Sequence, residues 1–265
     1  MPKLKENIKS NIFLEAGINH FGDIAAANKI IKFFIKSEYK NLTFMIHNEA
    51  FYEKQILDNK INFTLQKSFY AKAIKICQKN NKKVGLSVCD LKSCNYLMDL
   101  DFDFYKILGI SINNKQLIQE IDKKKKPTYV SLAIANNDKI KKLIKYFKNK
   151  KNLNLIYTSM SYEPGDLNLN RISYLNKKFQ IPVGYGHHYN NLIPFSLINF
   201  YDIKFIFFYI KGFFKNKKKY YPDNDHAIFI KDLKNVYDVI EESNIIIKNK
   251  KNNEKIKLND KKIKK

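Results

Sequence analysis

The chain has 265 residues, 45% of them hydrophobic, and a formal net charge of +24 at pH 7. This size and composition are typical of one globular domain, and no uninterrupted apolar run approaches the roughly 18 residues of a membrane-spanning helix. Nearly all cations are lysines, with Arg171 as the single arginine, so the charge predicts solvated helix faces and argues against specific nucleic-acid recognition, which favours arginine.

Short apolar runs alternate with longer amphipathic stretches, and we count eight such pairs. The predicted strands are 12–16, 42–46, 84–88, 104–108, 128–133, 153–158, 181–185 and 204–210. This alternation predicts parallel βα units. Eight units favour closure, and residues 17–22 lack the glycine-rich phosphate turn of a doubly wound sheet. The predicted fold is therefore α/β, a single (β/α)8 TIM barrel.

The first helix illustrates the pattern, because Asp23 can cap it and apolar residues from Ile24 to Ile35 recur at helical spacing. We assign 1–247 to the barrel and 248–265 to a lysine-rich tail that we expect to be disordered. The charged start has no apolar signal segment, so we expect a cytoplasmic protein without a membrane role. Cys77, Cys89 and Cys94 have no metal or redox spacing and are interpreted as reduced structural thiols.

Polar side chains at the ends of the predicted strands are the candidate site residues, because barrel chemistry occurs at the C-terminal ends of the strands. They are Glu15, Asn19, His20, Asp23, His47, Asp90, Lys106, Ser131, Ser159, Ser161, Tyr162, His187, His188, Asp223, Asp225 and His226.

Glu15 is the most informative of them, since a carboxylate on an apolar strand is costly to bury without partners. It is either functional or a structural carboxylate bonded to backbone N–H groups or to a lysine inside the barrel. Lys106, also on an apolar strand, can bind phosphate or form a Schiff base. His187 and His188 follow a glycine-containing strand end, and they are either site residues or a hydrogen-bonded surface feature.

Four segments resemble the sialic acid synthase family. Residues 13–23, Phe-Leu-Glu-Ala-Gly-Ile-Asn-His-Phe-Gly-Asp, are similar to the family's Ala-Glu-Ile-Gly-x-Asn-His-Asn-Gly-Asp. Residues 183–188, Val-Gly-Tyr-Gly-His-His, resemble Val-Gly-Tyr-Ser-Asp-His, and residues 104–109 resemble Phe-Lys-Ile-Ala-Ser. Pro222-Asp223 resembles Gly-Pro-Asp, and all four segments match in order and spacing.

The resemblance implies condensation of phosphoenolpyruvate with an N-acyl amino sugar, aided by a divalent metal, Mn or Mg. The product would be a nonulosonic acid of the N-acetylneuraminate, legionaminate or pseudaminate type. Glu15 would be the acid/base, and His188 would ligate the metal. The substrate-binding residues would be Asn19, Lys106, Ser131, Tyr162 and Asp223. Whether the chain forms a homodimer is left open.

Several family positions are replaced, which weakens the implied phosphate and metal sites. The phosphate-binding lysine falls on Thr43, and Ser-Thr-Pro on strand three becomes Ser87-Val88-Cys89. An asparagine, a serine and the second metal histidine fall on Met160, Gly186 and Gly212. The chain ends with the predicted barrel, so we also expect the family's C-terminal antifreeze-protein-like domain to be absent.

Three hypotheses remain open. The chain is an active synthase with altered contacts, a catalytically degenerate barrel acting as a binding or scaffold subunit, or a nonspecific polyanion binder that uses its lysine surface. Salt-dependent nucleic-acid affinity would distinguish the third from the others.

Overall fold

A computed structural model of the chain describes residues 11–47, 53, 63–133, 135–213 and 221–248. The strands are β1 (Ile12–Gly17), β2 (Asn41–Ile46), β3 (Lys83–Val88), β4 (Phe104–Ile107), β5 (Thr128–Ser131), β6 (Leu153–Thr158), β7 (Val183–His187), β8 (Ile206–Lys211) and β9 (Ile228–Phe229). The helices are α1 (Ile24–Lys36), α3 (Lys67–Lys79), α4 (Leu91–Leu97), α5 (Lys115–Asp122), α6 (Asn137–Tyr146), α7 (Asn170–Phe179), α8 (Ile193–Leu197) and α9 (Leu233–Lys248).

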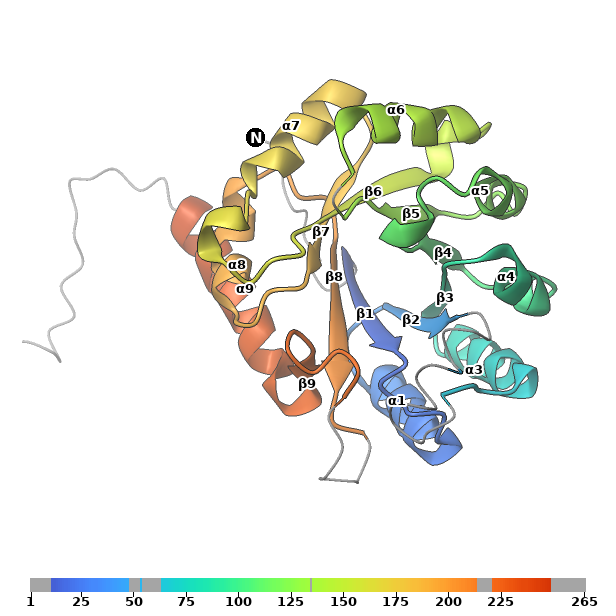
Figure 1. Ribbon diagram of the computed structural model, residues 1–265. Helices are drawn as coiled ribbons and strands as arrows, with labels where there is room; N and C mark the ends of the chain where they lie inside the picture. The colour runs from blue at the N-terminus through green and yellow to red at the C-terminus, as the bar shows by residue number, and fades with distance from the viewer. Residues whose placement is uncertain (1–10, 48–52, 54–62, 134, 214–220, 249–265) are drawn as a thin grey trace, which may run out of the picture.

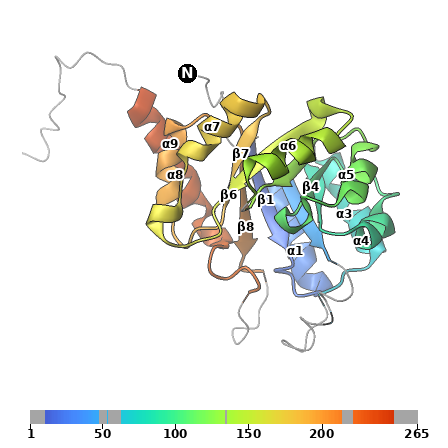
Figure 2. The same ribbon diagram turned by 45° about the horizontal axis from the view of Figure 1, so that its top comes forward.

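The predicted (β/α)8 barrel is confirmed. Strands β1 to β8 pair in chain order and in parallel, and β8 pairs with β1 to close the sheet. The helices surround the strands in both views (Figures 1 and 2). Among the described residues, we find no helix with the length and apolar character needed to cross a membrane.

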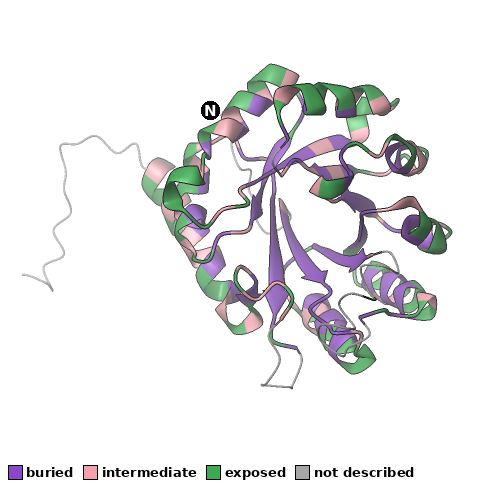
Figure 3. Ribbon diagram, in the orientation of Figure 1, coloured by how far each residue is buried: buried purple, intermediate pink, exposed green. Residues whose placement is uncertain are grey.

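Two apolar layers hold the barrel together. Outward-facing strand residues such as Leu14 and Leu42 are fully buried in one core cluster with helix residues such as Ile30 and Phe34. Figure 3 shows the result, since the strands are buried while each helix is buried on one side and exposed on the other. A smaller cluster lies inside the barrel and consists of Phe13, Phe104, Ile156, Phe205 and Phe207, with Tyr129 packed against it.

Most predicted strands are reproduced within two residues, and the deviations have local causes. Strand β7 begins and ends two residues later than predicted, because Pro182 has no N–H and contributes only its carbonyl, which accepts from the Leu155 N–H at 2.9 Å. Strand β5 ends at Ser131 rather than 133, before Ala133 takes a φ of 43°. The short strand β9, parallel to β8, was not predicted.

The first helix has the predicted cap, since the Asp23 carboxylate accepts from the N–H groups of Ala25 and Ala26. Ile24 is 49% exposed, so its predicted packing against the sheet is wrong; as the first helical residue it lies at the end of the buried stripe. The three cysteines are buried and free. The predicted tail at 248–265 lies outside the described residues, apart from Lys248 at the end of α9.

Candidate active site

A buried ion pair joins Glu15 on β1 to Lys106 on β4 near the C-terminal ends of both strands. The Lys106 ammonium donates to both carboxylate oxygens of Glu15, at 2.7 Å to Oε2. Both residues are less than 5% exposed. Two buried charges are stable only when they are paired and hydrogen-bonded, so the pairing explains how an apolar strand can carry each of them. A lysine inside the barrel is also the partner that Glu15 would have if it were a structural carboxylate.

The pair lies above the aromatic cluster inside the barrel. The Lys106 ammonium is 5.3 Å from the ring centroid of Phe207 and 5.4 Å from that of Tyr209. These distances are within the range of cation–π attraction. Strand pairing sets Tyr209 beside Glu15, and burial followed by the Glu15 charge raises the pKa of Tyr209 well above its ordinary value. The phenol therefore stays protonated and can donate to the carboxylate.

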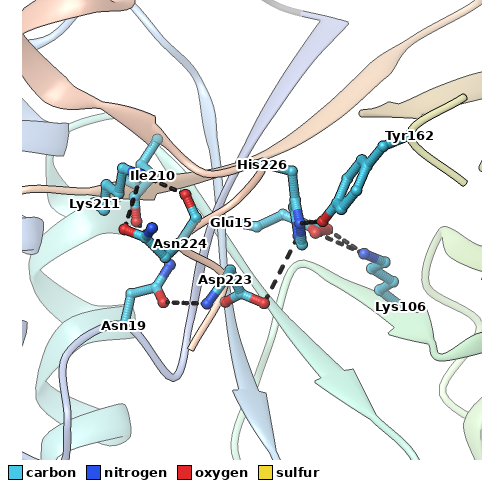
Figure 4. A network of polar contacts seen from close by, with 9 residues as sticks. All are labelled: Glu15, Asn19, Lys106, Tyr162, Ile210, Lys211, Asp223, Asn224 and His226. Atoms are coloured by element: carbon cyan, nitrogen blue, oxygen red, sulfur yellow. Dashed lines mark hydrogen bonds and ion pairs between the residues drawn. The ribbon is translucent and has the colours of Figure 1, made fainter. Parts of the chain in front are cut away.

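Asp223 reaches the same place from the segment after β8, where Asn19 fixes its backbone. The Asn19 side chain accepts from the Asp223 N–H at 3.3 Å and donates to the carbonyl of Ile210 at 3.1 Å (Figure 4). Burial, and then the charge of Glu15, raise the pKa of Asp223 to about 7, against the opposing effect of Lys106. Its Oδ2 is buried and has no hydrogen-bond partner among the described residues.

Gly17 makes this close approach feasible. It has a φ of 52°, and a Cβ there would lie 2.9 Å from Asp223 Oδ2 and 2.7 Å from the Tyr209 ring. A side chain at this position would therefore displace the carboxyl group or the phenol, and the backbone conformation itself favours glycine.

His226 connects Tyr162 to Asp223. Its Nδ1 is 3.3 Å from the Tyr162 hydroxyl, and its Nε2 is 3.8 Å from Asp223 Oδ1 (Figure 4). Its ring stacks on His188, with centroids 4.3 Å apart and planes 13° apart. Burial lowers the pKa of His226 to about 4, helped by the positive charge of Lys106. Burial and then His226 hold the pKa of His188 well below its usual range.

The two adjacent histidines face opposite sides of the strand. His187 points away from the barrel axis, with its ring 4.3 Å from that of Phe195 on α8 and its Nδ1 3.3 Å from the Tyr185 hydroxyl. Only His188 belongs to the cluster around Lys106. Strand alternation dictates this difference, because successive side chains point to opposite faces.

A row of hydroxyl groups lies on the inner wall beside Lys106. Ser87 is aligned with Lys106 across β3 and β4, and its hydroxyl is 3.0 Å from that of Thr43. Ser131 is two residues beyond Tyr129, the partner of Lys106 on β5, and alternation puts its side chain on the same inner side. No contact of the Ser131 hydroxyl with the charged pair is observed.

The positions at which the chain departs from the family pattern have different structural surroundings. A Cβ at Gly186 would lie 2.4 Å from Thr158 Oγ1, so a neighbouring hydroxyl fills the space of the expected serine. Val88 is fully buried in the outer core, and Met160 is 62% exposed. Gly212 has a φ of 112°, a conformation that favours glycine over histidine.

The described residues do not fit a divalent metal. The nearly parallel rings of His188 and His226 present their nitrogen lone pairs in separate planes, so they do not converge on one ion. No group of three His, Cys, Asp or Glu side chains in the described part of the chain is arranged to hold a metal. Two or more protein ligands are normally needed to compete with water. The Mn or Mg site stays a prediction.

The sequence predicted Glu15, Asn19, Lys106, Tyr162, His188 and Asp223 as site residues and included His226 among the candidates at the strand ends, but it gave no role to Tyr209. Tyr209 was hidden in an apolar strand, and only its alignment with Glu15 identifies it. The signal for His226 was only its position after the last predicted strand, in the segment that also contains Asp223.

A barrel with a carboxylate–lysine pair and further acidic and imidazole groups at its C-terminal end has its polar groups where TIM-barrel enzymes have their active sites. A model of the NeuB family matches residues 25–252, and the chain therefore belongs to that family, the sialic acid synthases. Glu15, Asn19, His20 and Asp23 precede the matched range, and the other candidate residues lie within it.

Several of the relatives are named as synthases of related sugar acids. The chain is 35% identical to the pseudaminic acid synthase of Campylobacter jejuni over 97 residues, which are 35% of this chain and 28% of that protein. It is 26% identical to the N,N'-diacetyllegionaminic acid synthase of the same species over 203 residues, covering 68% of this chain and 61% of the relative. The chain thus spans less than two thirds of the length of these relatives.

Solved structures agree on the fold. The N-acetylneuraminic acid (sialic acid) synthetase from Leptospira borgpetersenii serovar Hardjo-bovis superposes with a TM-score of 0.79 at 22% identity. The superposition covers 96% of this chain and 90% of that one. At this identity the likeness supports the barrel and leaves the substrate to be argued from the site.

Proposed function

We propose that the chain condenses phosphoenolpyruvate with the open-chain aldehyde of an N-acyl amino sugar and releases inorganic phosphate. The product is a nonulosonic acid of the N-acetylneuraminate, legionaminate or pseudaminate type. Membership of the NeuB family supports a sugar-acid synthase. The names of the relatives, which include pseudaminic and legionaminic acid synthases, support this choice of acceptors.

The observation that carries the proposal is the buried Glu15–Lys106 pair at the C-terminal end of the barrel. An ammonium has three N–H donors, and Glu15 engages two of its directions, so one donor is left for an incoming anion. Phosphoenolpyruvate would give Lys106 a second anionic partner and loosen its hold on Glu15. The carboxylate could then take a proton from the water that attacks during the reaction.

The other residues take roles that follow from their positions. Ser131, on the same inner wall as Lys106, contacts phosphoenolpyruvate. Asp223 and Tyr162 bind hydroxyl groups of the acceptor, since His226 joins the two (Figure 4) and Asp223 lies close enough to Glu15 to have its pKa raised by that charge. Asn19 acts by positioning, because its observed bonds hold the Asp223 backbone to strand β8.

The test is a coupled measurement of phosphate release and product mass with phosphoenolpyruvate and a panel of N-acyl amino sugars. We expect phosphate release only when both substrates are present, and we expect loss of the product in Glu15→Gln and Lys106→Met. The matched control is Lys67→Met, which removes a partly exposed lysine that is paired with Asp99. It should leave the rate unchanged.

Calorimetry with phosphoenolpyruvate separates the alternatives. Folded protein that neither binds phosphoenolpyruvate nor forms product would refute the synthase proposal. Binding without product, unchanged by Glu15→Gln, would instead identify a degenerate barrel that serves as a binding subunit. Product formation that depends on Glu15 excludes the degenerate barrel.

A further inference from the structure

His226 links two of the candidate site residues through its two ring nitrogens. Its ring lies between the Tyr162 hydroxyl and the Asp223 carboxyl group (Figure 4).

The hydrogen of the imidazole is best placed on Nε2. The Asp223 carboxyl oxygen lies 3.8 Å from Nε2 and favours a hydrogen there, while the Tyr162 hydroxyl can donate to Nδ1 at 3.3 Å. A protonated ring would also carry a hydrogen on Nε2, so the donor is present in either charge state of this arrangement.

Two buried polar atoms at this point have no partner among the described residues: Nε2 of His226 and Oδ2 of Asp223. Buried donors and acceptors are nearly always satisfied, by water or ligand where protein does not reach them. An N–H donor next to a carboxyl oxygen can bind a carbonyl oxygen and a neighbouring hydroxyl of one sugar molecule.

The residues at the same point are poorly arranged to bind a metal ion. Stacking keeps the lone pairs of His188 and His226 in separate planes, and Gly212 contributes no side chain. The Lys106 ammonium lies close enough to depress the pKa of both histidines, and the same positive charge opposes a second cation.

We propose that the His226 imidazole, through its Nε2–H, binds the carbonyl oxygen of the acceptor and stabilises the negative charge that forms there, in place of a divalent metal. Tyr162 and Asp223 are positioning residues that fix the tautomer. This inference rests on the proposed condensation. Neutral imidazole is a competent electrophile when its tautomer is fixed by its neighbours.

The step balances without a further reagent. C3 of phosphoenolpyruvate forms the new bond to the carbonyl carbon, and the carbonyl π pair moves to the oxygen held by His226. Water adds its hydroxide to C2, and its proton passes to the new alkoxide. The C2–O bond to phosphate then breaks, inorganic phosphate leaves, and the C2 hydroxyl becomes the 2-keto group as its proton goes to phosphate.

The first arm of the test measures the ring itself. The chain has five histidines, so ¹⁵N-detected ring correlations give few patterns, and the one absent in His226→Gln belongs to His226. We expect hydrogen on Nε2 and an unprotonated Nδ1 near pH 7.5, with mixed tautomers in Tyr162→Phe. Tyr174→Phe is the matched control, since Tyr174 and Tyr162 are similarly exposed, at 44% and 42%. Hydrogen on Nδ1 would overturn the assignment.

The second arm measures metal. Electron paramagnetic resonance titration with Mn²⁺ should show no stoichiometric binding, and chelated protein should retain its rate of condensation. We expect His226→Phe to lower kcat about 100- to 1,000-fold, the usual cost of removing one donor to a developing oxyanion, with KM changed less. His226→Gln, which keeps an N–H donor, should lose less. One tightly bound Mn²⁺ per chain, removed by His188→Ala, would refute the inference.

The two proposals fail in different ways. If the wild-type chain forms no product with any acceptor, the proposed condensation fails, while the tautomer and Mn²⁺ measurements still show whether His226 carries its hydrogen on Nε2 and whether the cluster binds a metal. If product forms only with Mn²⁺, the condensation stands and the role of His226 is rejected.

Discussion

The Glu15–Lys106 pair should control stability as well as activity, and a double-mutant cycle measures this. Lys106→Met keeps the length of the side chain but leaves the Glu15 carboxylate in a pocket that also contains Asp223. Glu15→Gln leaves the ammonium with a neutral amide oxygen and the Phe207 and Tyr209 rings, and with no carboxylate at position 15. Breaking a buried pair on one side costs about 3–5 kcal/mol of unfolding free energy, because an uncompensated charge remains.

The double variant, Glu15→Gln with Lys106→Met, removes both charges together. Its destabilisation should therefore be far less than the sum of the two single effects, with a coupling energy of several kcal/mol. The chain has no tryptophan, so urea unfolding is best followed by far-ultraviolet circular dichroism. Lys67→Met, which removes an exposed ion pair, is the control and should be near wild type. Additive single effects would refute the coupling.

Three more predictions concern buried groups. Burial lowers the pKa of His20 to about 3, so unfolding free energy should fall by up to about 1.4 kcal/mol per pH unit from this residue as pH drops below 6.5, where only the unfolded chain takes up the proton. Urea titrations of the wild type and of His20→Gln at pH 8 and pH 5 would contradict this if the difference in stability between the two proteins did not change with pH. The raised pKa of Asp223, about 7, means that the folded state loses stability as pH rises from about 4 to 7. Asp223→Asn should therefore be more stable than wild type at pH 8, by at most about 4 kcal/mol, and equal to it near pH 4; a constant difference would argue against titration of Asp223. Gly184→Ala should lower the melting temperature, because its Cβ would lie 2.2 Å from the Phe205 ring, whereas Gly165→Ala, with nothing within 4 Å, should not.

The fold was predictable because parallel βα units leave a strong mark in the sequence. Each strand is buried on both faces, so it appears as an apolar run whose period differs from that of the helices. Boundaries were less secure, as β7 shows, because Ile181 is apolar and β-branched but precedes a proline that cannot donate to the ladder. Hydrophobicity indicates which residues are buried, but the limits of a strand depend on which N–H groups can join the hydrogen-bond ladder between strands.

The charged part of the site was predictable for the opposite reason. Glu15 and Lys106 interrupt apolar strands, and such an interruption demands a partner. That they are each other's partner depends on the register across β1 to β4, which no local pattern contains. The position of His226 is a consequence of the loop after β8, where chain direction is set by the Asn19 bonds to Asp223 and Ile210. Contacts 191 and 204 residues apart in the chain have no short-range signal.

The energetics of the cluster bear on the choice between a synthase and a scaffold. A buried ion pair is seldom more stabilising than apolar side chains of similar volume, and the raised pKa of Asp223 means that its charge opposes folding at neutral pH. A barrel that only presented its outer surface would be at least as stable with apolar residues at Glu15, Lys106 and Asp223. These groups instead lie together above an aromatic floor, with unpaired polar atoms on Asp223 and His226. Sites that bind or transform ligands are where such a loss of stability is expected, so the arrangement favours a synthase over a scaffold.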